Sequence, residues 1–150
     1  MIDEQRLREF IRESNHIEGI YREPTTEEVN IARAFLNPAQ TSVDDLIAAV
    51  DVFEPGAKLR DKTGMDVRIG KHIAPKGSPE ILLRLINLLA HMQDYDPHTM
   101  HLAYEYLHPF TDGNGRSGRL LWLWMMVKRD GQMPPLGFLH SFYYQTLAAA

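Results

Sequence analysis

The sequence contains no cysteine, so no disulfide can form, which is compatible with a reducing cytoplasm. It also lacks an excess of positive charge, and the net charge of −4 argues against nucleic acid as the main partner. It lacks a long apolar run as well, because the run at 120–127 is far too short to span a bilayer. The first six residues do not resemble a signal peptide. We therefore expect a cytoplasmic protein that binds neither nucleic acid nor a membrane.

The composition is that of an ordinary globular protein. Hydrophobic residues make up 44% of the chain and charged residues 24%, which excludes a disordered protein. A chain of 150 residues is long enough for one domain with a real core. There is no internal repeat, low-complexity tract or linker, so we expect a single domain over residues 1–150.

Helix-forming patterns occupy most of the chain. Apolar residues recur at helical spacing, and polar residues that cap helices precede several of these segments. The apolar run at 120–127 is expected to belong to a core helix buried on all sides. The sequence therefore predicts an all-α fold of about seven helices around a central one. The expected helices are 3–18, a segment from Thr25 to about Leu36, a segment from about Ser42 to Phe53, one beginning at Ser78, then 97–107, 115–130 and a last helix that includes Leu136 to Leu147.

Residues 57–75 have a different character. Isolated apolar residues alternate with charged ones, and the turn sequence Asp61 to Gly64 lies among them. An ordinary connecting loop and a short exposed hairpin both fit this pattern. If strands form, Val67 to Ile69 and Lys71 to Ile73 are the expected ones.

Chemically reactive side chains are concentrated in residues 108–119, which read HPFTDGNGRSGR. The stretch begins with His108, and histidine is the side chain that exchanges a proton most easily near neutral pH. Asp112 precedes the glycines and is suited to bind a hard cation such as Mg²⁺. We interpret the stretch as a base and a metal ligand placed next to each other.

The second half of this stretch indicates a phosphate site. The Gly113-Asn114-Gly115 turn leads directly into the central helix, and backbone N–H groups at such a helix start bind phosphate. Arg116 and Arg119 are three positions apart on one helix face, which suggests more than one phosphate. The P-loop ending Gly-Lys-Ser/Thr is absent. Taken singly, each residue also fits a structural turn with solvated arginines.

Two further pairs of polar residues share a helix face. His98 and His101 have a spacing seen in zinc sites, but no acidic third ligand lies on the same face, so ordinary solvated or core histidines are expected. Ser14 and Glu18 are four positions apart near the end of the first expected helix. On their own, Ser14 and Glu18 indicate only an exposed helix end.

Residues 108–119 resemble the Fic-domain signature, H-P-F-x-D/E-G-N-G-R-x-x-R, and match it at every position. The resemblance implies a Fic-type helical core with a small β-hairpin flap. It implies transfer of AMP from ATP, the substrate, to a Ser, Thr or Tyr hydroxyl of a protein target, with Mg²⁺ or Mn²⁺ as cofactor. Self-modification is an alternative outcome of the same chemistry.

The same resemblance implies a role for each position of the catalytic loop at 108–119. His108 would be the general base, Asp112 the metal ligand and Phe110 a buried anchor. The phosphate nest would be formed by Gly113, Asn114 and Gly115, and the outer phosphates would be held by Arg116 and Arg119. Because position 115 is still glycine, AMP transfer is favoured over direct phosphorylation.

Residues 14–19, SNHIEG, resemble the Fic inhibitory motif S/T-x-x-x-E-G/N. This would place the protein in the subgroup with an N-terminal inhibitory helix (class II), here residues 1–19. By the same resemblance, Glu18 would pair with Arg119, and Ser14 would help to anchor the helix.

By resemblance, residues 57–75 would be the flap that aligns a target segment as an added strand. The residues expected to dock the target are Val67, Arg68, Ile69, Lys71, His72 and Ile73.

Two alternatives to AMP transfer follow from the same residues. Glu18 and a metal could remove AMP from a modified protein, or the domain could bind nucleotide without turnover. Phosphorylation with the γ-phosphate of ATP is a minor third option. Intact His108 and Asp112 speak against a pure binding module.

Overall fold

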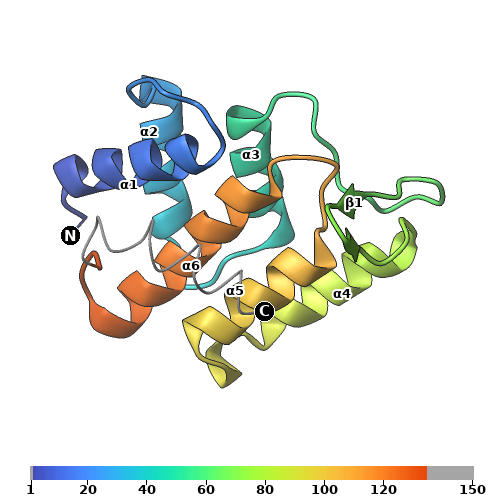
Figure 1. Ribbon diagram of the computed structural model, residues 1–150. Helices are drawn as coiled ribbons and strands as arrows, with labels where there is room; N and C mark the ends of the chain where they lie inside the picture. Colours follow the sequence, from blue (N-terminus) through green and yellow to red (C-terminus); the bar gives the residue numbers. More distant parts are fainter. Residues whose placement is uncertain (1, 135–150) are drawn as a thin grey trace.

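The computed structural model describes residues 2–134, and helices dominate this part of the chain (Figure 1). The all-α fold class is therefore confirmed, and the last helix expected from Leu136 lies outside the described residues. The helices are α1 (Glu4–Ile17), α2 (Thr26–Leu36), α3 (Val43–Phe53), α4 (Pro79–Ala90), α5 (Pro97–Leu107) and α6 (Asn114–Asp130), with a short 3-10 helix, η1 (Met92–Asp94), before α5.

The helices begin where polar side chains satisfy their first N–H groups. The Asp3 carboxylate caps α1 by accepting from the backbone N–H of Gln5 and Arg6. Thr25 and Glu28 form the expected capping box at α2. A second capping box, between Ser42 and Asp45, starts α3. These local bonds explain why the sequence predicts most helix starts to within a residue.

Helix α6 is the centre of the fold and packs against α5, α3, α2 and α1 (Figure 1). From Asn114 to Met125 its residues are buried, except for Gly115 and Trp122, which are half-buried. A helix covered on every side has no solvent face, which is why the run at 120–127 is apolar all round, while the buried polar residues lie in its N-terminal turns. It ends at Gly131, whose φ of 74° closes the helix as a C-cap.

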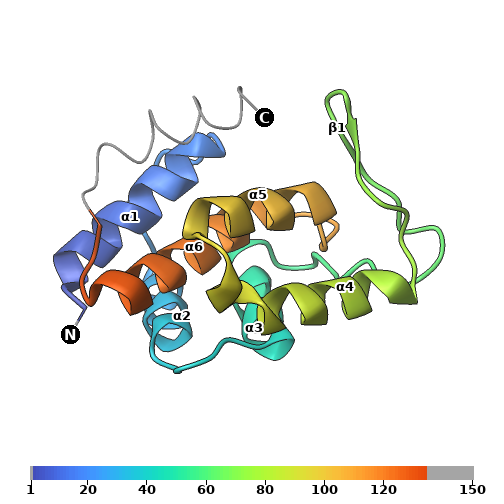
Figure 2. The ribbon, with the colours of Figure 1, turned by 90° about the horizontal axis from the view of Figure 1, so that it is seen from below.

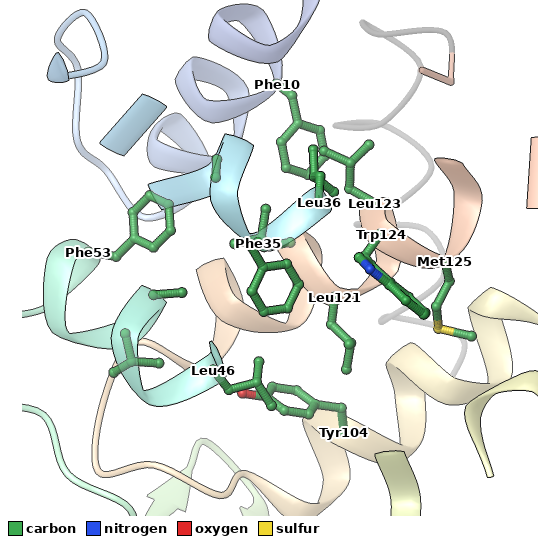
Figure 3. Packing of buried hydrophobic residues seen from close by; sticks show 14 of the residues in the cluster. Phe10, Phe35, Leu36, Leu46, Phe53, Tyr104, Leu121, Leu123, Trp124 and Met125 are labelled. Carbon is green, nitrogen blue, oxygen red and sulfur yellow. The ribbon is translucent and has the colours of Figure 1, made fainter. Parts of the chain in front are cut away.

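One hydrophobic core joins the helices around α6 (Figure 3). Phe10 of α1 lies beside Leu123 of α6, and Tyr104 of α5 is fully buried on the other side. Burying one such side chain contributes about 1.5–3 kcal/mol. This packing holds α1 and α5 against α6, and both deliver side chains to its N-terminal half.

The segment 57–75 forms a hairpin that projects from the helical body (Figure 2). Strands β1 (Arg68–Ile69) and β2 (His72–Ile73) pair antiparallel, with Arg68 opposite Ile73 and Ile69 opposite His72. The strands are shorter than expected, because Val67 and Lys71 lie outside them. An isolated hairpin of this size is marginal in water, so its attachments to the helices matter.

The apolar face of α4 is only partly covered. Ile81 and Leu85 are buried, whereas Leu83 and Ile86 are 63% and 48% exposed.

None of the helices within residues 2–134 has both the length and the apolar content needed to cross a bilayer.

Candidate active site at the start of the central helix

A short loop carries the chain from α5 to α6 (Figure 1, orange). It begins at His108, the C-cap of α5, whose φ of 50° and ψ of 61° are left-handed. Histidine adopts this conformation more readily than most side chains. The loop ends at Gly113, the N-cap of α6, which is left-handed as well, with a φ of 76°. These two positions turn the chain sharply and place the histidine next to the start of the central helix.

Asn114 holds the loop closed from within. Its side chain accepts from the Phe110 N–H at 2.9 Å and donates to the Phe110 carbonyl at 2.8 Å. Phe110 itself is 1% exposed, so it anchors the loop in the core. The Asn114 side chain is therefore bonded to the loop backbone. Only the backbone N–H of Asn114 is placed to bind a ligand.

A segment that the sequence motif does not include supports the loop from outside. The Arg60 N–H donates to the Pro109 carbonyl, and the Thr111 N–H donates to the Lys58 carbonyl, each at 2.8 Å. Leu59 and Phe110 thus form an isolated antiparallel bridge. The loop is consequently fixed on both sides before any ligand binds.

The N-terminus of α6 is suited to an anion. The Gly113 N–H is taken by the Asp112 carboxylate at 2.8 Å, and no side chain in the described part of the chain caps the helix. The first N–H groups of a helix have no intrahelical acceptor, and the helix dipole adds positive charge there. Backbone donors of residues 114–116 therefore form a candidate anion site.

Asp112 lies exposed at the edge of this anion site. Mg²⁺ is commonly bound by one or two carboxylates together with phosphate oxygens, rather than by an all-protein cage. Within residues 2–134, no group of three His, Asp or Glu side chains is arranged to hold a metal alone. One exposed carboxylate beside a phosphate site therefore fits a cation that arrives with a nucleotide.

Arg116 is buried and paired with a carboxylate. Its Nη2 lies 2.7 Å from Oε2 of Glu54, the C-cap residue of α3, and its guanidinium lies over the Phe53 ring at 5.7 Å. Sequence reasoning missed Glu54 because no motif includes it. Only the packing of α3 on α6 brings it here.

Arg119 is 1% exposed and contacts the end of α1. Its Nε donates to the Ser14 hydroxyl at 2.7 Å, and its Nη2 donates to the Ser14 carbonyl at 3.0 Å. The same Nη2 lies 2.9 Å from the Glu18 carboxylate. The structure thus brings Arg119 to Ser14 and Glu18, which lie 105 and 101 positions before it in the sequence.

Gly115 leaves room for the Glu18 carboxylate. A Cβ atom at Gly115 would lie 2.3 Å from Glu18 Oε1, well inside the distance at which atoms collide. Glu18 therefore lies directly against the first turn of α6, beside the anion site.

The environment of His108 keeps its ring neutral. Burial, then the charges of Arg60 and His72, lower the pKa of His108 to about 4, while the Glu105 backbone and Asp112 act in the opposite direction. At neutral pH the ring therefore has an unprotonated nitrogen that can accept a proton.

Two buried titratable side chains, His101 and Glu105, form a pair on α5. Burial raises the pKa of Glu105 to about 8 and lowers that of His101 to about 4, and the Glu105 carboxylate is 3.8 Å from His101 Nε2. His101 Nδ1 also contacts the Gly118 carbonyl at 3.1 Å, so it is a core histidine and not a solvated one. Gly118 leaves room for this pair, because a Cβ there would lie 2.4 Å from Glu105 Oε1 and 3.0 Å from Tyr104 Cδ1. No sequence pattern indicates that Glu105 is buried.

We expect Glu105 to make the folded state less stable as pH rises. Between pH 6.5 and 8 the folded state largely retains a proton on Glu105 that the unfolded state has lost. The unfolded His101 and His108 lose their protons over the same range, whereas the folded ones are already neutral, and this offsets part of the effect. The free energy of unfolding should therefore fall by about 1 kcal/mol over this range. Urea denaturation at the two pH values measures the change. Glu105→Gln should nearly abolish it, and an equal fall in that variant would contradict the assignment.

Of the expected flap residues, His72 contacts the end of α5, just before the loop. His72 Nε2 is 3.1 Å from the Tyr106 carbonyl of α5, and the two rings are 4.8 Å apart. Ile69 and Ile73 are 42% and 65% exposed, and Arg68 is exposed too. Val67 is half-buried and Lys71 is exposed.

Comparison with known proteins adds one finding. The sequence model of the Fic/DOC family matches residues 79–126, which run from the start of α4 into α6 and include the whole catalytic loop. A comparison with curated proteins finds no match. Helix α1 and the flap lie outside the matched residues, so the match does not assign the inhibitory subgroup. The match supports a relationship of residues 79–126 to the Fic/DOC family.

Proposed function

We propose that this protein is an adenylyltransferase that moves AMP from ATP to a Ser, Thr or Tyr hydroxyl of a protein target. One observation carries the proposal: a neutral histidine and an uncapped helix N-terminus are joined by a rigid short loop. Fic-type activity is the family-level expectation for residues 79–126. AMP transfer is the finer assignment that we infer from the site.

In this mechanism the residues of the loop and α6 divide the work. The backbone N–H groups of residues 114–116 hold the phosphates next to the loop, and Arg116 and Arg119 hold the outer ones. The neutral His108 ring accepts the proton as the target hydroxyl oxygen attacks the α-phosphorus. A new P–O bond forms to the target, the bond to the β-phosphate oxygen breaks, and pyrophosphate leaves. Positioning and charge stabilisation supply most of the rate.

Asp112 is the residue that would hold Mg²⁺ or Mn²⁺, which when bound would neutralise phosphate charge. We expect Asp112→Ala to lose transfer, and excess chelator to stop the unchanged protein as well. Asp112→Asn is the matched control for geometry, because its amide oxygen can still accept from the Gly113 N–H. It should also be inactive if the charge is what matters. Full activity in chelator would rule out the metal.

We propose further that α1 inhibits this activity in the manner of class II Fic proteins. Supporting this, Ser14 and Glu18 both bind the Arg119 guanidinium. An arginine held this way is not available to an outer phosphate, and the Glu18 carboxylate would repel one.

In the same proposal, the flap residues 67–73 would align the target segment as an added strand.

Removal of AMP is a second candidate that one observation favours. The Glu18 side chain is 39% exposed and lies against Gly115 at the anion site. A carboxylate there could orient a water molecule toward a phosphorus atom. Incubation of an AMP-modified protein with the wild type and with Glu18→Gln measures this activity directly.

The experiment that tests the main proposal uses ATP labelled at two positions. Glu18→Gly is incubated with cell lysate and either α-labelled or γ-labelled ATP. Label from the α-position, in lysate proteins or in the protein itself, is the expected result. Label from the γ-position would indicate phosphorylation, and no label with retained ATP binding would indicate a binding module.

A further inference from the structure

Arg60 is a buried arginine that no sequence motif singles out. Its side chain is fully buried, and it forms no ion pair with any residue between 2 and 134. Removing a charge from water is costly unless the charge is well hydrogen-bonded. A buried arginine without a salt bridge therefore calls for an explanation.

The Arg60 guanidinium is satisfied by backbone carbonyls from three separate places. Nε donates to the His108 carbonyl at 2.7 Å, and Nη2 donates to the Leu107 carbonyl at 3.0 Å. Nη1 donates to the Met65 carbonyl at 3.0 Å and to the Pro75 carbonyl at 2.8 Å. The fork of donors on arginine suits it to bind several acceptors at once.

These carbonyls belong to two functional parts of the molecule. Leu107 ends α5, and His108 is the proposed base, held in a left-handed conformation. Met65 and Pro75 flank the hairpin on its two sides, just before β1 and just after β2. One side chain therefore ties both ends of the flap to the peptide that carries the base.

We propose that Arg60 is a positioning residue that joins the flap and His108 into one unit, so that the target segment and the base are held in register. The hairpin alone is too small to be stable, and the Arg60 hydrogen bonds reach Met65 and Pro75, where the hairpin joins the rest of the chain. The inference rests on the proposed function in calling His108 a base. The structural coupling is measurable without ATP or a target.

Arg60 also affects the charge of the ring. The charged or titratable groups that act on His108 are Arg60, His72 and Asp112; Arg60 and His72 lower its pKa while Asp112 raises it. Loss of the Arg60 charge should therefore raise the pKa of His108. Because burial also lowers this pKa, the variant that isolates the charge is Arg60→Lys, which keeps the charge and changes the hydrogen bonds.

The experiment compares Arg60→Met, Arg60→Lys and the control Arg84→Met, which removes the same charge from an exposed position of α4. Folding is checked by circular dichroism, the His108 pKa by NMR titration of histidine-labelled protein, and the flap by hydrogen exchange of its amides. In Arg60→Met we expect the His108 pKa to rise by about one unit and flap amides to exchange faster. Arg84→Met should change neither.

Arg60→Lys separates position from charge. It keeps the charge but has a single nitrogen in place of the fork, so flap protection should fall while the His108 pKa stays low. In the transfer assay we expect kcat to fall by about 10²-fold, with KM for ATP little changed, because misplacement costs rate more than binding.

Two results would overturn the inference. One is a folded Arg60→Met with unchanged His108 pKa and unchanged flap exchange. The other, which decides the question if Arg60→Met does not fold, is an Arg60→Lys variant with wild-type flap protection. Failure to find AMP transfer would leave both of these readouts intact, so the two proposals fail separately.

Discussion

His108→Ala is expected to lower AMP transfer by about 10²–10⁴-fold, because this is the usual contribution of a general base. ATP affinity should change little, since the phosphates are held by the start of α6 and by arginines, and not by this ring. The loop should keep its shape as well. The bonds that close it run through Asn114 and the backbone of residues 58–60, whereas the imidazole bonds to the Glu105 backbone of α5.

The measurement uses the released background, Glu18→Gly, so that the starting activity is high. Transfer is followed with α-labelled ATP, and ATP affinity is followed by calorimetry. His91→Ala is the matched control, because His91 is an exposed histidine at the end of α4. Undiminished transfer by folded His108→Ala would refute the proposed role of the ring.

Glu18→Gly is expected to raise transfer by about 10²-fold over the wild type. The Glu18 carboxylate and the Ser14 hydroxyl occupy a buried arginine that would otherwise hold an outer phosphate. ATP can still reach the backbone N–H groups of α6, but its α-phosphorus would be out of line with the base. A misplacement of about 1 Å costs roughly this factor.

Three further variants give this prediction its controls. Glu23→Gly removes a carboxylate whose partner is the exposed Arg12, at 3.4 Å, and it should have no effect. Ser14→Ala should release the activity partially, because it removes one of the bonds to Arg119. Glu18→Gly combined with His108→Ala should be silent. Equal labelling by wild type and Glu18→Gly would contradict the inhibitory role and would mean that Ser14 and Glu18 are an ordinary helix end. Reduced labelling by Glu18→Gly would indicate a catalytic or structural role for Glu18.

The sequence by itself determined most helix starts within the described residues, and it predicts the chemistry of the loop. Capping residues such as Asp3 and Thr25 act on backbone groups a few positions away, so their effect is local and readable. The spacing of Ser14 and Glu18 likewise places them on one helix face without any knowledge of packing. The roles expected for residues 108–119 come from their resemblance to the Fic signature. The family match over residues 79–126 includes this stretch.

The tertiary structure alone decided how these parts meet. The pairing of Arg116 with Glu54 spans 62 positions, and no motif contains it. The resemblance proposes the contact between Glu18 and Arg119, but its distance and its burial depend on how Phe10 and its neighbours dock α1 on α6.

The protonation states of buried groups were also beyond the sequence. Glu105 and Arg60 look like ordinary charged residues, yet the pKa of Glu105 is raised by burial, and Arg60 is satisfied by carbonyls from the flap and from α5. Desolvation and long-range hydrogen bonds depend on which elements surround a side chain, and that is settled only when the helices pack. Local bonding explains what the sequence determined, and long-range packing explains what it did not.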